Sequence, residues 1–200
     1  MPDLRETKNF WRSRLPHWEI ERGIYFITIR CANSLPSQAQ ARLEELKTSI
    51  ESQDANSESF KLFQREVFAT CEKYLDRGYG FCPFENGNAA QQLIADLEFW
   101  SEEANWLVPS YCVMPNHVHL LASPIDAQSM DLHKYLSRLK GRSARNINNV
   151  LNRKGAFWQT EWFDRWIRSE AELEKTVRYI RNNPVKAKLV NAPEKYPFTK

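Results

Sequence analysis

The residues best suited to chemistry in this chain are two histidines, His117 and His119, within residues 112–121. Apolar and β-branched neighbours predict a strand there, and residues two apart in a strand project from the same face. Because neutral imidazole is a common ligand of divalent metals, the pair could form half of a metal site. A hydrogen-bonded surface pair is equally typical of His-x-His, so the spacing alone leaves both interpretations open.

A second candidate lies near the end of the chain, where Tyr179 and Asn183 share one face of a predicted helix. A tyrosine hydroxyl, with a pKa of about 10, is a weak nucleophile at neutral pH. Attack on a phosphodiester becomes feasible where a divalent cation neutralises the phosphate oxygens. Core packing by the tyrosine, and helix-ending chemistry by an Asn that precedes Pro184, are the alternatives.

Charge is divided unevenly along the chain, although the net charge is only +3. Residues 36–105 hold 6 Lys and Arg against 13 Asp and Glu, whereas residues 131–190 hold 14 against 6. A polyanionic partner would therefore bind the C-terminal half, unless these cations simply form a solvated helix face. The candidate phosphate contacts recur along one predicted helix and are Lys134, Arg138, Lys140, Arg142 and Arg145.

Aromatic residues offer a further kind of contact with nucleic acid. Trp158, Trp162 and Trp166 recur every four residues in the segment that follows the basic helix. Indole rings stack well on unpaired bases, but they are just as often packed in a protein core. The pattern therefore indicates either base stacking or core packing.

The elements that must position these residues alternate between strands and helices. Strands are predicted over residues 24–30, 106–114 and 117–123, and helices over residues 36–53, 60–75, 89–103, 129–151 and 170–182. A capping box at Ser169 opens the last helix, and Pro184 is expected to end it. This pattern favours one α+β domain over residues 1–200, with an N-terminal arm over 1–22 and a C-terminal tail over 185–200.

Composition excludes several other classes of protein. No apolar run reaches the roughly 18 residues of a membrane-spanning helix, so no membrane partner is expected. The four cysteines lack C-x-x-C spacing, which argues against a disulfide framework and against a cysteine-rich zinc site. A cytoplasmic protein is the expectation that fits these features.

Several motifs occur together in the order seen in one bacterial family. They are Met114-Pro115-Asn116-His117-Val118-His119-Leu120-Leu121, then Phe157-Trp158-Gln159 and Phe163-Asp164-Arg165-Trp166-Ile167-Arg168, and last the run from Tyr179 to Val190. Leu139-Lys140 on the preceding helix also fits. The chain thereby resembles the single-tyrosine HUH transposases, in particular the REP-associated tyrosine transposases.

The resemblance implies an α+β, ferredoxin-like antiparallel sheet with helices mainly on one face. Extra helices within residues 31–105 would be inserted before the histidine strand, in a role that the family does not assign. It also implies an enzyme that uses Mg²⁺ or Mn²⁺ to nick and rejoin single-stranded DNA at REP-like hairpins through a 5′-phosphotyrosine intermediate. Such enzymes are bound to the nucleoid when they engage DNA, and act as monomers or as dimers.

By matching position, the resemblance makes Tyr179 the nucleophile and His117 and His119 metal ligands. Asn183 would be the third ligand, at a position where related transposases often have Gln. The expected DNA contacts are the five cations of the basic helix together with Trp158, Arg165, Arg168 and Lys186.

Two other functions compete with the transposase interpretation. A catalytically silent relative would grip hairpin DNA or RNA through the same basic helix without cutting it. A zinc hydrolase or structural zinc protein would need further ligands, and His17 and His133 lie in no recognisable ligand spacing with the pair.

Overall fold

The computed structural model describes residues 7–12, 16–48, 58–129 and 131–200. Its main sheet contains β3 (Tyr25–Arg30), β4 (Trp106–Met114), β5 (His117–Pro124) and β6 (Phe163–Trp166). The strand order is β4-β5-β3-β6, and every neighbouring pair is antiparallel. This is the ferredoxin-like α+β arrangement that the family resemblance implied, with helices on both faces of the sheet.

The histidine hairpin places successive residues of β5 on opposite faces of the sheet. A two-residue turn, Pro115-Asn116, joins β4 to β5, with Met114 paired to His117 and Cys112 to His119. Val118 and Leu120 belong to the larger apolar core. Leu121, two residues after His119, packs in a second cluster on the opposite face, so the two histidines lie on that second face.

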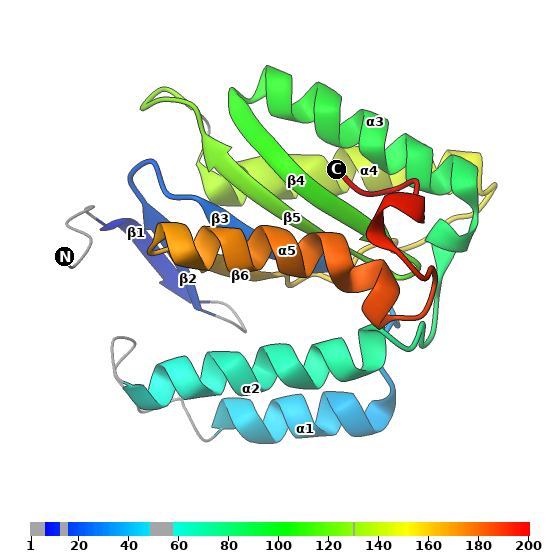
Figure 1. Cartoon of the computed structure of the whole chain (residues 1–200), viewed down its shortest axis with the longest axis horizontal. Helices are drawn as coiled ribbons and strands as arrows, with labels where there is room; N and C mark the ends of the chain where they lie inside the picture. The colour runs from blue at the N-terminus through cyan, green and yellow to red at the C-terminus, as the bar shows by residue number, and fades with distance from the viewer. Residues whose placement is uncertain (1–6, 13–15, 49–57, 130) are drawn as a thin grey trace.

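Two helices, α3 (Gly87–Glu103) and α4 (Leu132–Val150), cover the first face (Figure 1). Asn86 and Asp131 cap them by accepting backbone N–H groups through their side-chain oxygens. Leu93 and Leu97 of α3 and Leu136 of α4 belong to the same core as Val118. Each helix connects two strands of one sheet, and the right-handed preference of such crossovers places both on the same side.

The opposite face carries α5 (Glu170–Lys186), which runs across the sheet in Figure 1. The capping box is confirmed at its start, where Ser169 accepts the N–H of Glu172. The prediction that Pro184 ends this helix is wrong, because α5 continues to Lys186 with Pro184 inside it. Proline lacks a donor and disturbs the preceding turn, yet the helix completes its last turn with Ala187 donating to the carbonyl of Asn183.

The extra helices expected before the histidine strand are also present. They are α1 (Ser37–Thr48) and α2 (Glu58–Leu75), which lie side by side in Figure 1. They enclose an apolar cluster of their own, with Leu43 of α1 and Phe63 and Val67 of α2 among its members. The predicted continuation of the first helix to residue 53 falls largely outside the described residues.

The two ends of the chain add short elements. Within the predicted arm, β1 (Thr7–Arg12) and β2 (Pro16–Ile20) form a two-stranded antiparallel sheet. Short 3₁₀ turns, η1 (Pro83–Glu85) and η2 (Pro193–Lys195), precede α3 and the final residues. The last residues extend the β4 edge, since Val113 donates to Phe198 and Lys200 to Tyr111. No helix in the described ranges is long and apolar enough to cross a membrane.

Candidate active site

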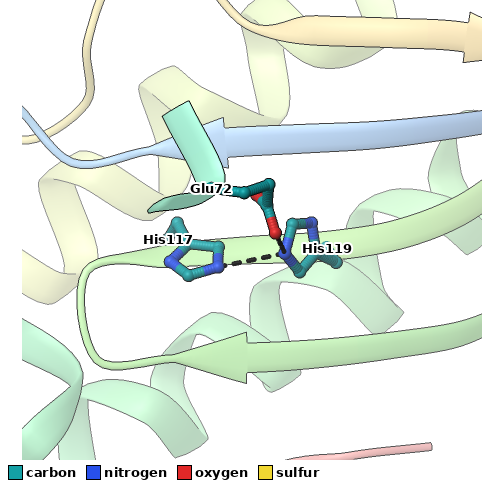
Figure 2. A group of neighbouring side chains, drawn as sticks. All are labelled: Glu72, His117 and His119. Atoms are coloured by element: carbon teal, nitrogen blue, oxygen red, sulfur yellow. Dashed lines mark hydrogen bonds and ion pairs between the residues drawn. The ribbon is translucent and has the colours of Figure 1, made fainter. Parts of the chain in front are cut away.

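The two imidazoles of β5 meet at their Nε2 atoms, which lie 3.0 Å apart (Figure 2). Each ring is held from its other nitrogen. Nδ1 of His117 donates to Oδ1 of Asn116 over 2.8 Å, and Nδ1 of His119 shares a 2.8 Å hydrogen bond with Thr28. This support fixes both rings and leaves the two Nε2 atoms facing one shared point, which is the arrangement of metal-ligating histidines.

The protonation state of His117 also suits a ligand. Its side chain is fully buried, and burial lowers its pKa to about 3, with the neighbouring His119 adding to the effect. The amide of Asn116 donates to the carbonyl of Tyr79, which fixes its oxygen toward the ring. His117 therefore stays neutral with its proton on Nδ1, so the lone pair on Nε2 is available.

A third side chain that sequence analysis did not single out completes the cluster. The carboxylate of Glu72, on α2, lies 3.5 Å from Nε2 of His119. One ligand atom from each of Glu72, His117 and His119 lies within 4.8 Å of the other two. Two imidazoles and one carboxylate form a donor set that divalent metals commonly use.

A signal for Glu72 was present in the sequence. On a helix it shares a face with Phe68, four residues before it, and Leu75, three residues after it. A carboxylate on an apolar helix face must be paired when that face is buried, because an unpaired buried charge is costly. The pattern indicates a buried acid but does not identify its partner.

Glu72 is ionised in this setting. Burial by itself raises its pKa, but the nearby His119 and His117 and a hydrogen bond from Tyr179 outweigh burial and hold the pKa at about 2. Its second oxygen, Oε1, is buried and has no hydrogen-bond partner among the described residues. An unsatisfied anionic oxygen beside two imidazole nitrogens fits a divalent cation.

The tyrosine reaches the same point from α5. The hydroxyl of Tyr179 donates a hydrogen bond to Oε2 of Glu72, and its ring lies 5.5 Å from that of His119, centroid to centroid. Burial raises the pKa of Tyr179, and the negative charge of Glu72 raises it further. The phenol is therefore neutral while no cation offsets that carboxylate.

Asn183 lies one turn beyond Tyr179 and is almost fully buried. Its amide nitrogen donates to the backbone carbonyl of Tyr179 over 3.5 Å, a long hydrogen bond. Its amide oxygen, Oδ1, has no hydrogen-bond partner within the part of the chain that the structure describes. The structure thus brings Asn183 beside the nucleophile candidate, and its role as a ligand stays a prediction.

Comparison with protein families identifies the matching stretch of sequence. The family described as Transposase IS200 like matches residues 83–183, which is half of the chain. This chain belongs to the IS200-like transposase family. His117, His119, Tyr179 and Asn183 all lie inside the matched stretch, whereas Glu72 lies before it.

A solved structure supports the fold of this IS200-like transposase. This structure, a REP-associated tyrosine transposase bound to a REP hairpin, aligns with a TM-score of 0.57 at 16% identity, over 94% of this chain and 82% of the other. A protein from Deinococcus radiodurans R1 aligns with a TM-score of 0.40 at 17% identity, over 80% and 89% of the two chains. No curated protein matches the sequence.

Three of the predicted DNA contacts of the transposase lie on the same face of the sheet as His119 and Tyr179. The ammonium group of Lys186 lies 2.6 Å from Asp76, 4.0 Å from Glu72, and 5.5 Å from the centre of the Tyr179 ring. Arg165, at β6, and Arg168, just before α5, line a hollow on the same face. Lys186 is therefore close enough to the site to meet a phosphate bound there.

The basic helix of the transposase lies on the opposite face. Arg142 pairs with the buried Asp96 at 2.8 Å, and Lys134 pairs with Asp131 at 3.0 Å. Arg138 lies over the ring of Trp100. The remaining cations of this helix are Lys140 and the exposed Arg145. The sheet separates all five from Tyr179, so the structure does not bring them to the site.

Two of the predicted DNA contacts, Lys140 and Trp158, already form hydrogen bonds within the protein. The Lys140 ammonium donates to the carbonyl of Thr160, and burial lowers its pKa to about 8. The indole N–H of Trp158 donates to Ser143 over 3.0 Å, and only 8% of the residue is exposed. Little of the Trp158 ring is therefore available for a base to stack on.

Proposed function

We propose that this transposase is a divalent-metal-dependent endonuclease and strand transferase that acts on single-stranded DNA at REP-like hairpins through a 5′-phosphotyrosine intermediate. The observation that supports it best is the convergence of Tyr179 and His119 on one carboxylate, Glu72. These residues come from α5, β5 and α2, and bring a nucleophile and metal-ligand chemistry to one point.

His117, His119 and Glu72 would hold the cation, with the amide oxygen of Asn183 as a further donor. When bound, Mg²⁺ or Mn²⁺ would neutralise the charge on Glu72 and on the phosphate oxygens of DNA. Asn116 and Thr28 keep the two imidazoles in the orientation that ligation needs.

In the proposed reaction the Tyr179 oxygen attacks the phosphorus atom of a DNA phosphodiester. A bond forms between that oxygen and phosphorus, and the bond from phosphorus to the 3′ oxygen breaks. The Glu72 carboxylate accepts the hydrogen bond that orients the phenol. The phenol proton passes to solvent water, and the departing 3′ oxygen takes a proton from solvent water. The resulting 3′-hydroxyl can attack the phosphotyrosine later, which reverses the step and rejoins strands.

The DNA partner is inferred from the family and from charge. The REP-associated transposase with the same fold was solved with a REP hairpin. In this chain Arg165, Arg168 and Lys186 would contact the strand near Tyr179, while the basic face of α4 would meet another part of the hairpin. Action as a monomer in the cytoplasm completes the proposal.

The decisive experiment incubates the protein with labelled hairpin oligonucleotides and Mn²⁺ and scores a covalent protein–DNA band on a denaturing gel. The expected result is a band that EDTA prevents and that Tyr179→Phe abolishes, with hairpin binding by the variant nearly unchanged. A normal band from Tyr179→Phe would remove Tyr179 from this role. Tight binding without any product would instead favour a silent hairpin-binding protein.

A zinc hydrolase is a second candidate, because two histidines and one glutamate also form a catalytic zinc site in some enzymes. Comparing Zn²⁺ with Mn²⁺ in the same assay separates the two functions. A covalent band with Mn²⁺ favours the transposase, whereas hydrolysis that needs Zn²⁺ and leaves no covalent band favours the hydrolase.

A further inference from the structure

A hollow of about 400 Å³ opens beside the candidate active site, between α2, β6 and the start of α5. Its lining includes Arg65 and Phe68 from α2, Phe163 and Arg165 from β6, and Arg168. None of these residues was needed to form the metal-ligand cluster. A volume in the range of small-molecule pockets suits an unpaired nucleotide and is too small for a duplex.

Aromatic rings form a common wall between the hollow and the site. Phe68 lines it, and the Phe68 ring lies 4.8 Å from that of Phe163, 6.0 Å from that of Tyr179 and 6.5 Å from that of His119. Phe26 lies on the same wall and stacks on His119 at 5.5 Å. A strand held in the hollow would therefore lie against the same aromatic rings that contact Tyr179.

The charge of the lining suits an anion. Three arginines face one carboxylate, Glu172, which pairs with Arg165 and accepts the backbone N–H of Arg168. Burial lowers the pKa of Arg165, Glu172 opposes that effect, and Arg168 and Arg65 lower the pKa further by repulsion. Three cations this close repel one another, so a bound phosphate would relieve the repulsion.

The remaining requirement is a surface for a base. Phe163 and Phe68 are only partly buried, so part of each ring faces the hollow. Arginines that track a backbone, combined with rings on which bases stack, are the usual means of holding single strands without reading their sequence. A deeper cavity lies between the α1–α2 pair and the sheet. Its described lining lacks this combination of several arginines with aromatic rings, because Arg30 is its only arginine and lies beside two acids, Glu72 and Glu161.

We infer that this hollow is the channel for the single strand next to the scissile phosphate, with Arg65, Arg165 and Arg168 on its phosphates and Phe163 under a base. The inference rests on the proposed function. It means that α2 would bind the DNA strand through Arg65 in addition to supplying Glu72. It also places the strand on the face opposite the basic helix α4.

The test measures binding, not cleavage, so that it stands apart from the proposed function. All proteins carry Tyr179→Phe, no metal is added, and the probe is a fluorescent, unstructured oligonucleotide of thymidines. Fluorescence anisotropy gives the dissociation constant between about 50 and 200 mM salt, because each phosphate contact on a single strand contributes about 0.7 to the slope of log affinity against log salt.

Arg65→Ala and Arg168→Ala are each expected to weaken binding and to reduce that slope by about 0.7. Phe163→Leu is expected to weaken binding about 5- to 150-fold with the slope unchanged, as for loss of one stacked base. Arg178→Ala is the matched control, since Arg178 is exposed on α5 and does not line the hollow. It should leave both the affinity and the slope within error of the parent.

Arg65 is exposed, so its variant keeps the test valid even where Phe163→Leu fails to fold. Unchanged slopes for both Arg65→Ala and Arg168→Ala would overturn the inference, most clearly if Arg145→Ala on α4 reduces the slope instead. A protein that keeps Tyr179 reports separately on the covalent band. Reduced slopes without that band would support the single-strand channel and refute the proposed chemistry. A covalent band with unchanged slopes would support the proposed chemistry and refute the channel.

Discussion

The carboxylate of Glu72 lies 3.5 Å from Nε2 of His119, although α3 and β4 separate the two residues along the chain. Glu72 precedes the stretch that matches the transposase family, and His119 lies within it. The candidate metal site is thus shared between the family's sheet and the inserted helix pair. This relationship gives the inserted helix pair, α1 and α2, a candidate role in metal binding.

Replacing Glu72 by Gln should remove most of the affinity for Mn²⁺. Gln keeps the shape of the side chain but loses the anionic oxygen that fits the cation. We expect a loss beyond the 10- to 100-fold that is typical when only the support of a ligand is removed. Titration calorimetry of the protein with Mn²⁺ alone, without DNA, measures it.

Asp76→Asn provides the control for that experiment. Asp76 lies one turn from Glu72 and pairs with Lys186, but it is not part of the ligand cluster. It should change Mn²⁺ affinity far less than Glu72→Gln does. If Asn183→Ala abolishes binding and Glu72→Gln leaves it intact, the ligands are the histidines and Asn183.

Thr28→Val should weaken Mn²⁺ binding about 10- to 100-fold, because it removes the hydrogen bond that orients the His119 ring while keeping the volume of the side chain. The same calorimetric titration measures the change. Thr176→Val is the matched control, since Thr176 is also buried but donates to the backbone of its own helix. Equal effects of the two variants would indicate general destabilisation instead of lost orientation.

His17 should stabilise the fold more at pH 6 than at pH 9.5. Burial lowers its pKa, but hydrogen bonds to Asp164 and Glu161 outweigh burial and raise the pKa to about 9. Because this folded value exceeds the unfolded value of about 6.5, the stabilisation is complete below pH 6.5 and is lost as the pH rises toward 9.

The measurement is urea unfolding of the wild type and of His17→Gln at both pH values. The difference in the free energy of unfolding should shrink by on the order of 3 kcal/mol between pH 6 and pH 9.5. Titrations common to both proteins cancel in this difference. A difference that is the same at both pH values would show that the His17 ion pairs do not stabilise the fold.

Trp158→Phe should lower stability by about 1 kcal/mol, because it loses the hydrogen bond to Ser143 while keeping an aromatic ring in the core. Urea unfolding measures this cost. Hairpin affinity should be unchanged, since so little of the Trp158 ring is exposed. A large loss of affinity in a protein of normal stability would return Trp158 to the DNA interface.

The sequence predicted the features that depend on local spacing. Residues two apart in a strand share a face, which placed His117 with His119. Residues four apart in a helix do the same, which placed Asn183 beside Tyr179, and the cap at Ser169 followed from the side-chain oxygen that backbone donors need. The end of α5 was missed, because a proline in the last turn removes only one donor and buried packing can hold that turn.

The meeting of these elements was decided only by the tertiary structure. No spacing rule brings Glu72 of α2 to His119 of β5, since that contact depends on how the inserted helix pair packs on the sheet. The alternation of β5 also directs the histidines away from α4, so the basic helix and the tyrosine lie on opposite faces. Local sequence spacing thus determines which residues share a face. Which residues they contact across the fold depends on long-range packing, which leaves no periodic signal in the sequence.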